Sequence, residues 1–531
     1  MADMYVPINP RSDLALMNTL CYIILEQGWE NEKFIAERTS GYKEFRKHIF
    51  ENYKPQDVAN ITGIDVKDLY ELARVYAKAD KAMSAWTMGV NQSSIGTDTV
   101  SAICNLALIT GNLGKQGATA LSITGQCNAM GTRETGFTSS LPGYRNFASS
   151  YDRQEYATLV NVPVEDVPTK RGYSYPQIID AIESGEIKAL WLVATNPLVS
   201  FPDQKRLRRA LNKLELLVVQ DAFKSESSLK ADVVFSAATW SEKEGTYTNS
   251  ERRCNYARKA VEPLADTKSD FHIVLEFSKY FEGVNEKLFP NWEQPIDAFN
   301  EWKKVSSGRL CDYSGMSYKL IEELGGIQWP CNEKYPKGKA RLYDEDMPCP
   351  TDDGKAKLLA LDWLPLSEPC NISFPLTLNT GRTVEQWHTR TKTKTISILN
   401  DLAPEAWIEI NPLDAKKLEV SSGDRIDISS IRGRISDIIV RESQNIRQGS
   451  IFVPFHYNEQ LINTITKAEF DPKSFEPNFK QCAVQLHSAK VPNGIKLKEQ
   501  EISGVLEHIV IKNESILVQK ASESSKLKIK D

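Results

Sequence analysis

Residues 189–197 read ALWLVATNP, a short apolar run that ends in an Asn-Pro pair. Comparable apolar runs lie at residues 214–219 and 233–235, and polar residues follow each of them. Short strands that are apolar throughout are typical of a parallel sheet covered on both faces, and ligands bind at the carboxyl ends of such strands. This part of the chain is therefore predicted to be α/β, with a binding edge where the strands end.

The segment on the N-terminal side also alternates between helix and strand. Amphipathic helices are predicted over residues 13–26 and from Asp65 onward. A strand over residues 82–89 leads into a polar turn that reaches Gly96, and a helix through Cys104 follows. Helix, strand, glycine-containing turn and helix in this order indicate a second α/β domain.

On the C-terminal side the pattern changes to β-structure from Phe374. Residues 406–410, 425–428 and 435–440 alternate or are rich in β-branched side chains, with turns between them. They predict a closed β-domain of about 110 residues. Residues 306–365 are rich in Gly, Pro, Asp and Trp without periodicity, and we interpret them as a long irregular insertion.

The composition excludes several classes of protein. The chain has 531 residues, of which 41% are apolar and 25% are charged, as in ordinary globular proteins. Its 65 Lys and Arg residues and 70 Asp and Glu residues give a net charge of -5, without the basic excess of a nucleic-acid-binding protein. No apolar run approaches the roughly 20 residues of a membrane-spanning helix. We expect a soluble protein with no nucleic-acid partner and no membrane partner.

The cysteines give no sign of a metal centre. Nine of them are scattered along the chain, and none forms a Cys-x-x-Cys pair. Because iron–sulfur and zinc sites normally use closely spaced thiolates, we predict neither in this chain. Scattered free thiols are typical of a reducing compartment, and the first residues do not resemble a signal peptide. A cytoplasmic location is expected.

A first polar cluster lies at residues 125–134, which read GQCNAMGTRE. Glycines that flank amide side chains suit a backbone pressed against a ligand, and the adjacent Arg133 and Glu134 form a charged tip that can hold an anion. A tight turn with a surface ion pair would give the same pattern, so spacing alone leaves both interpretations open.

Two further clusters follow. Asn196 and Asp221 come directly after strands, near the polar residues 244–253, and such residues commonly bind ribose and phosphate groups. Loop caps and salt bridges explain that cluster equally well. Residues 380–391, together with residues 454–458, carry Trp, His, Arg and Thr side chains at a density that a surface loop does not need. We favour a functional role for this third cluster.

Taken together, the clusters and their surroundings resemble the molybdopterin oxidoreductase family, and within it the catalytic subunits of assimilatory nitrate reductases. The resemblance extends over nearly the whole chain, to about residue 490. The segments that carry it are WTMGVNQ at 86–92, TGNLGKQG at 110–117, GQCNAMGTRETG at 125–136, ATNP at 194–197, WSEKEGTYTNSERR at 240–253, GIQWP at 326–330, GRTVEQWHTRT at 381–391, Asn463, and DPKSFEPNFK at 471–480. Each segment alone is weak, but the combination in this order is specific.

The resemblance implies an α/β fold with two dinucleotide-binding-like α/β domains and a C-terminal double-psi β-barrel. It also implies one molybdenum atom held by two molybdopterin guanine dinucleotides. The expected boundaries are 1–118 for the remainder of the first molybdopterin-dinucleotide-binding domain, 119–368 for the second α/β domain with its irregular insertion, 369–490 for the barrel and 491–531 for a tail of unknown role.

Site residues follow from the resemblance position by position. The residues expected to act on the substrate are Met130, Arg133 and Glu134. Cys127 does not lie at the family's metal-ligand position, so no side chain of this chain is assigned to the metal. The residues expected to bind the cofactor are Gly89, Asn91, Gln92, Gly96, Gly125, Gln126, Asn196, Asp221, Glu244, Gly245, Asn249, Arg382, His388, Thr389, Asn463 and Lys480.

Members of this family begin with a cysteine-rich segment for a 4Fe-4S cluster, followed by a βα unit and the cysteine that ligates molybdenum. Neither is found in this sequence, which we expect to start after those elements. The iron–sulfur cluster is therefore expected only in an N-terminal domain that this chain lacks, and the chain alone is expected to be inactive.

The expected reaction is the reduction of nitrate to nitrite by oxygen-atom transfer, in nitrate assimilation. Formate dehydrogenases also resemble the sequence but usually carry Asp-Met at the positions of Arg133 and Glu134. A guanidinium fork matches a planar oxyanion, and Glu134 can relay a proton if burial raises its pKa. Electrons are expected from a ferredoxin, a flavodoxin or an NAD(P)H-linked partner. The alternatives are a formate dehydrogenase-type enzyme and a non-catalytic scaffold subunit of the same fold.

Overall fold

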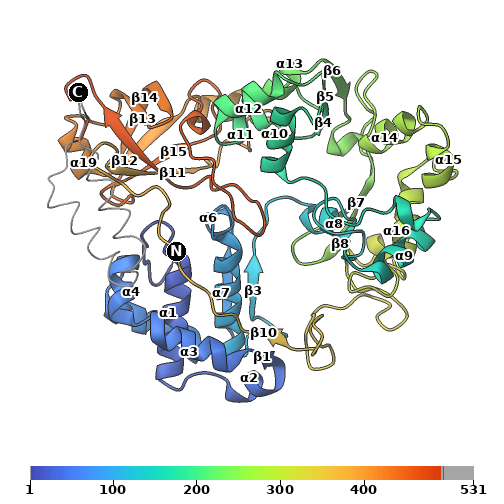
Figure 1. Cartoon of the computed structure of the whole chain (residues 1–531), viewed down its shortest axis with the longest axis horizontal. Helices are drawn as coiled ribbons and strands as arrows, with labels where there is room; N and C mark the ends of the chain where they lie inside the picture. Colours follow the sequence, from blue (N-terminus) through green and yellow to red (C-terminus); the bar gives the residue numbers. More distant parts are fainter. Residues whose placement is uncertain (1, 492–493, 496–531) are drawn as a thin grey trace. The chain divides into compact units, whose positions relative to one another are not determined.

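The computed structural model describes residues 2–491 and 494–495, and the chain forms two compact units (Figure 1). Unit 1 consists of Met1–Leu121, Leu198–Leu207 and Glu345–Asp531, and unit 2 consists of Ser122–Pro197 and Arg208–Asp344. Both contain helices and strands, and the C-terminal region contains a closed barrel, so the predicted fold class is confirmed. No helix among the described residues combines the length and the apolar character needed to cross a membrane.

The N-terminal part of unit 1 is a helical layer around α1. Leu14, Ile23 and Ile24 of α1 are fully buried, because this helix is apolar on most of its surface and α3, α4, α5 and α7 pack around it. The predicted helices over residues 13–26 and from Asp65 are confirmed. The helices are α1 (Asp13–Glu26), α2 (Glu32–Arg38), α3 (Tyr42–Asn52), α4 (Pro55–Thr62), α5 (Val66–Lys78), α6 (Met88–Asn91) and α7 (Gly96–Ile109).

Short strands connect this layer to the rest of unit 1. The strand β2 (Met83–Trp86) pairs with β3 (Thr119–Ser122), and it ends three residues before the predicted end because α6 begins at Met88. The strand β1 (Thr39–Ser40) pairs with β10 (Ala356–Lys357).

The boundary predicted at residue 368 is wrong. Residues 345–368 belong to unit 1, because Leu358 and Leu361 are buried in the helical core. Two side chains of that layer hold this segment: the Tyr53 hydroxyl donates to the carbonyl oxygen of Leu361 at 2.8 Å, and Asn105 donates to that of Leu359 at 2.9 Å.

The C-terminal part of unit 1 is a closed barrel with the strand order β11-β15-β12-β14-β13-β16. The pairs β11–β15 and β12–β14 are parallel, and the remaining pairs are antiparallel. Ile495 is 2% exposed in the barrel core, so the barrel extends beyond the boundary predicted at residue 490. The elements are β11 (Leu376–Gly381), β12 (Trp407–Ile410), β13 (Arg425–Ser430), β14 (Gly433–Glu442), β15 (Ser450–Pro454), β16 (Cys482–His487), α18 (Ser397–Leu402) and α19 (Pro412–Lys417).

Unit 2 contains the parallel sheet predicted from the apolar runs. Its strands are β4 (Ala189–Val193), β5 (Leu216–Asp221) and β6 (Val233–Ser236), in the order β4-β5-β6. Leu217 and Val219 of the central strand are buried, as expected for a covered parallel strand. The helices of this unit are α8 (Ala129–Glu134), α9 (Ser150–Leu159), α10 (Tyr175–Ser184), α13 (Glu226–Lys230), α14 (Asp270–Ser278), α15 (Val284–Leu288), α16 (Pro295–Ser306) and α17 (Tyr318–Glu323).

A second, antiparallel sheet of unit 2 consists of β7 (Gly245–Thr248), β8 (Arg253–Ala257) and β9 (Ile327–Gln328). One buried cluster includes Cys254 of this sheet together with Tyr313 and Trp329, and Figure 1 shows α8 and α16 beside the sheet. Two short helices, α11 (Pro197–Ser200) and α12 (Gln204–Leu211), run through the segment where the chain passes from unit 2 into unit 1 and back.

Candidate functional site

In unit 1, the loop after β11 is held by His456. The Nε2 atom of His456 accepts a hydrogen bond from the backbone N–H of Thr383 at 2.9 Å, and its Nδ1 atom lies 2.5 Å from the carbonyl oxygen of His388. Only a neutral imidazole with its proton on Nδ1 makes both contacts. Burial lowers the pKa of His456 to about 4, so the ring is neutral at physiological pH and keeps the loop in place.

This loop collects positive charge at one position. Arg382 Nη2 lies 3.2 Å from His388 Nδ1, and Lys480 donates to the carbonyl oxygen of Thr380 at 3.0 Å. Burial and then the charge of Arg382 lower the pKa of Lys480 to about 8, and the same two causes lower the pKa of His388 to about 4. The Thr383 hydroxyl is buried without a hydrogen-bond partner among the described residues. Cations that repel one another beside an unpartnered hydroxyl are a donor set that suits a phosphate group.

The predicted turn between β2 and α7 lies beside the same group of residues. Gln92 is hydrogen-bonded to Glu476, and the negative charge of Glu476 acts on Lys480. A Cβ atom at Gly96 would lie 2.5 Å from the carbonyl oxygen of Asn91, so the tight turn requires glycine there. The structure therefore brings four predicted cofactor residues of unit 1 together: Gln92, Arg382, His388 and Lys480.

Asp471 joins the turn to the segment that carries Lys480. It is 1% exposed and accepts hydrogen bonds from the amide and hydroxyl of Thr97 at 3.0 and 2.8 Å, and from the backbone N–H groups of Lys473 and Ser474 at 2.9 and 2.7 Å. Burial raises the pKa of Asp471, but the hydrogen bonds from Ser474 and Thr97 hold it below its ordinary value. The Asp471 carboxylate thus joins the start of α7 to the residues that follow Asp471.

Asn463 makes its hydrogen bonds with another segment of unit 1, and its role in cofactor binding stays a prediction. Its side-chain amide is 1% exposed and donates to the carbonyl oxygens of Val199 and Ser200 at 2.9 and 3.1 Å. Both amide hydrogens are therefore used within the protein. Asn91 accepts a hydrogen bond from the Trp86 indole at 3.0 Å. Gly89 is exposed, and a Cβ atom there would meet no atom within 4 Å, so a ligand can approach the backbone at this position; Thr389 is buried.

In unit 2, Asn196 lies just after the carboxyl end of β4, and Asp221 is the last residue of the neighbouring strand β5, as predicted. Asn196 is largely occupied, because its oxygen accepts from the Ser227 hydroxyl at 2.7 Å and its amide donates to Glu226 at 2.7 Å. Asp221 accepts from the backbone N–H of Phe223 at 3.1 Å. This end of the sheet therefore carries a carboxylate, while the asparagine stabilises the first turn of α13.

Of the remaining predicted cofactor residues of unit 2, Gly245 begins β7 and the others lie outside helices and strands. Glu244 accepts from the Tyr256 hydroxyl at 3.0 Å, and Asn249 accepts from the backbone N–H groups of Glu251 and Arg253, both at 3.1 Å, which stabilises its own turn. A Cβ atom at Gly125 or Gly245 would meet no atom within 4 Å, so a ligand can approach the backbone there. Gln126 is exposed beside Gly125.

The three predicted catalytic residues differ in their surroundings. Arg133 is exposed on α8 and forms no ion pair with any described residue. Glu134 is 1% exposed: its Oε2 atom accepts from the Tyr313 hydroxyl at 2.7 Å, and its Oε1 atom accepts from the Trp329 indole at 2.6 Å. Burial raises the pKa of Glu134 to about 7. Met130 is half-buried and packs against the core cluster that contains Tyr313, which helps to hold α8 in place.

Sequence reasoning missed Tyr313 and Trp329 as members of this site. Trp329 lies in the GIQWP segment, which carries part of the resemblance but to which the sequence assigns no role. Tyr313 lies in the insertion interpreted as irregular, where no local pattern marks it. His456 was noted only as part of a polar segment, and nothing in that segment points to Thr383 as its partner.

Comparisons with known proteins give a consistent family. A family model described as molybdopterin oxidoreductase matches residues 1–280, and one described as the molydopterin dinucleotide binding domain matches residues 376–483. The alpha subunit of the F420-dependent formate dehydrogenase of Methanocaldococcus jannaschii is 36% identical over 91% of this chain and 70% of its own length. The assimilatory nitrate reductase catalytic subunit of Bacillus subtilis is 33% identical over 92% of this chain and 68% of its own length. Among solved structures, acetylene hydratase from Pelobacter acetylenicus covers 92% of this chain and is itself covered to 72%, with a TM-score of 0.69 and 18% identity, which is a likeness of fold.

Proposed function

Because the chain belongs to the molybdopterin oxidoreductase family, we propose that it is the catalytic part of an enzyme that reduces nitrate to nitrite. The match to a dinucleotide binding domain supports a molybdopterin cofactor that carries molybdenum. When bound, this group supplies two electrons and takes up the oxygen atom that leaves nitrate. The proposal also includes nitrate as the substrate, a partner that donates electrons, and the guanine form of the dinucleotide.

The residues of unit 1 fit the phosphates of such a cofactor. Arg382 and Lys480 provide two cations, and His388 and the unpartnered Thr383 hydroxyl provide further hydrogen-bonding groups beside them. Burial and the charge of Arg382 lower the pKa values of Lys480 and His388. Such low values indicate a position that is rich in cations and short of negative charge. We assign these four residues to a phosphate group of the dinucleotide.

One observation carries the choice of substrate: Arg133 is exposed and unpaired on α8, next to a glutamate that is not available to neutralise it. A free guanidinium fork matches the planar arrangement of oxygens in nitrate. Glu134 is turned into the core and gives both carboxylate oxygens to Tyr313 and Trp329. We propose that Arg133 binds a nitrate oxygen and holds the anion while the oxygen atom is transferred.

Formate oxidation is the second candidate, because a formate dehydrogenase alpha subunit is 36% identical to this chain, as similar as the nitrate reductases are. Formate is also a planar anion that Arg133 would bind. The two reactions run in opposite redox directions, and this separates them in an assay.

The test uses the holoenzyme that contains this chain, with molybdenum measured on the same preparation. We expect nitrate-dependent oxidation of a reduced viologen dye and no formate-dependent reduction of the oxidised dye. Formate oxidation without nitrate reduction would reject nitrate as the substrate. A preparation without molybdenum and without either activity would indicate a non-catalytic scaffold.

A further inference from the structure

The carboxyl group of Glu134 is held on both sides. The Tyr313 hydroxyl donates to one oxygen at 2.7 Å, and the Trp329 indole N–H donates to the other at 2.6 Å. The residue is 1% exposed, whereas Arg133, its neighbour in the chain, is exposed. Adjacent residues of α8 thus point to different surroundings, and only Arg133 is accessible to a small anion.

The same network reaches the beginning of α8. The Tyr313 hydroxyl lies 2.6 Å from the Thr248 hydroxyl, and the backbone N–H of Thr248 donates to the side-chain oxygen of Asn128 at 2.8 Å. Asn128 directly precedes α8, and a Cβ atom at Gly131 would lie 2.1 Å from that same oxygen. The glycine therefore allows Asn128 to reach Thr248, and α8 is tied to the core at both of its ends.

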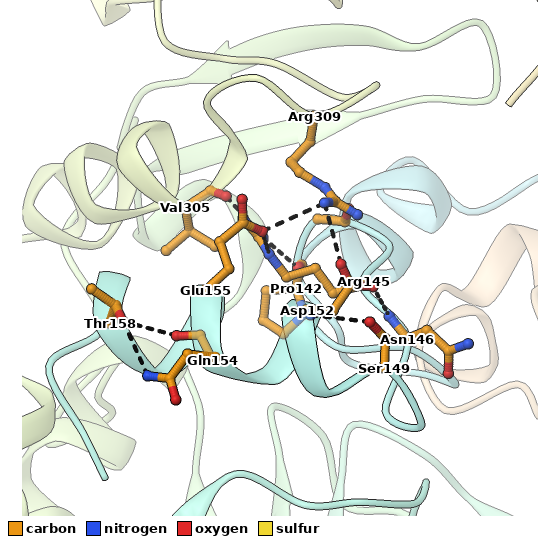
Figure 2. Close-up of polar contacts among 11 residues, drawn as sticks. Pro142, Arg145, Asn146, Ser149, Asp152, Gln154, Glu155, Thr158, Val305 and Arg309 are labelled. Carbon is orange, nitrogen blue, oxygen red and sulfur yellow. Dashed lines mark hydrogen bonds and ion pairs between the residues drawn. The ribbon is translucent and has the colours of Figure 1, made fainter. Parts of the chain in front are cut away.

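The backbone of Glu134 is held independently of its side chain. Its carbonyl oxygen accepts from the N–H of Gly143 at 2.7 Å. Figure 2 shows how the turn around Gly143 is fixed: Arg145 is fully buried, pairs with Glu155 at 2.6 Å, and donates to the carbonyl oxygens of Pro142 and Val305 at 2.8 and 2.9 Å. This turn supports the end of α8, and Tyr144 within it lies close enough to Glu134 and Arg133 for both charges to act on its hydroxyl group.

Arg252 completes the surroundings of Trp329. Its guanidinium lies 5.1 Å from the centre of the Trp329 ring and donates to the carbonyl oxygen of Trp329. The indole is therefore held in the orientation that directs its N–H at Glu134. Both donors to the Glu134 carboxyl are themselves fixed by a further contact, which is the arrangement that positions a neighbour accurately.

We propose that Glu134 is a positioning residue, whose carboxyl group, held by Tyr313 and Trp329, fixes the end of α8 so that Arg133 presents its guanidinium to the oxyanion. This inference rests on the proposed function of Arg133 and deepens it. The rival is that Glu134 passes a proton to the substrate. Its burial and its two donors argue for the first role, because a carboxyl that contacts substrate must reach the surface that the substrate occupies.

Substitutions at Glu134 separate the two roles. In Glu134→Gln, the amide oxygen accepts from Trp329 and the amide N–H donates to the Tyr313 oxygen, so the network persists while proton transfer is lost. Positioning predicts that kcat/KM for nitrate stays within about threefold of the wild type, with the same pH profile, whereas Glu134→Ala and Tyr313→Phe each raise KM about tenfold. Tyr318→Phe is the matched control, because the Tyr318 ring packs in the same cluster outside the network.

A double-mutant cycle tests whether the effect passes through Arg133. In an Arg133→Ala background, Tyr313→Phe is expected to cost less than about twofold, because the residue that it positions is gone. Amide hydrogen exchange gives a readout that does not depend on activity. Peptides that cover residues 125–136 are expected to exchange about fivefold faster in Tyr313→Phe and Glu134→Ala, and at the wild-type rate in Glu134→Gln and Tyr318→Phe.

The outcomes are distinguishable. If Arg133→Ala leaves nitrate kinetics unchanged, the proposed function fails and the inference fails with it. If Arg133→Ala is impaired but Glu134→Gln is as damaging as Glu134→Ala, the proton-transfer role replaces positioning. If the effects of Tyr313→Phe and Arg133→Ala are additive, the network is structural only, and the inference alone is overturned.

Discussion

The two hydrogen bonds that His456 makes to the loop after β11 predict a specific dependence of stability on pH. The imidazole accepts from Thr383 and donates to His388, so it holds the loop only while it is neutral. Burial lowers its pKa from 6.5 to about 4. Between these two values the unfolded chain binds a proton that the folded protein does not, so folding is increasingly opposed as the pH falls from 6.5 towards 4.

The size of the effect follows from the two pKa values. A difference of about 2.5 pH units, at 1.36 kcal/mol for each unit, corresponds to about 3.4 kcal/mol over the whole range. Integration between pH 7 and pH 5 gives a loss of about 2 kcal/mol in the free energy of unfolding. The contribution is complete above pH 6.5 and decreases below it.

The assay is urea denaturation of the wild type and of His456→Gln at pH 7 and pH 5. His388 titrates in both proteins, and because the charge of His456 contributes to its low pKa, the comparison measures His456 together with its effect on His388. The wild type is expected to lose about 2 kcal/mol more than the variant between the two pH values. Equal losses in the two proteins, within about 0.5 kcal/mol, would refute the conclusion that His456 is buried in its neutral form.

Three further predictions test the arrangement of unit 1. Asp471→Ala is expected to lower the free energy of unfolding by about 2–4 kcal/mol, measured by urea denaturation, because several donors that Asp471 accepts from are left unsatisfied; a loss below about 0.5 kcal/mol would contradict this. Lys480→Ala is expected to lower molybdenum per chain severalfold in the holoenzyme, whereas Lys490→Ala, which loses only a contact to the carbonyl oxygen of Glu419, keeps it; equal metal content in both would remove Lys480 from the cofactor site. Truncation after Lys490 is expected to cost about 2–3 kcal/mol relative to truncation after Ile495, measured by the same denaturation, because the Ile495 side chain leaves the barrel core; equal stability would show that this burial is dispensable.

Local sequence patterns predicted the elements that bury their own apolar residues. The helix over residues 13–26, the strands β4 to β6 and the barrel strands β12 to β14 follow from short-range periodicity. The segment 345–368 did not follow, because its strand β10 has two residues and is stabilised by a distant pair, Thr39 and Ser40. Such a contact has no signature in the neighbouring sequence.

The sequence predicted which segments carry the candidate site, but not the contacts between them. Motif resemblance predicted Arg133, Arg382 and Lys480 as site residues, since each lies in a distinctive segment. It could not find that Tyr313 reaches Glu134 across 179 residues of sequence, because only the folded chain brings them together. It also predicted Asn463 as a cofactor residue but not the backbone carbonyl group that its amide contacts, since a motif identifies a residue but not its hydrogen-bond partners.

The central claim is that Arg133 holds the oxyanion substrate, and one measurement tests it most directly. Molybdenum content and nitrate kinetics are measured on the same preparations of holoenzyme with wild-type Arg133, Arg133→Lys and Arg133→Ala. The account predicts that kcat/KM falls about 30- to 1000-fold in Arg133→Ala with molybdenum unchanged, and that lysine restores little because a point charge lacks the planar fork. Unchanged kinetics, or activity that falls only in step with molybdenum, would contradict it.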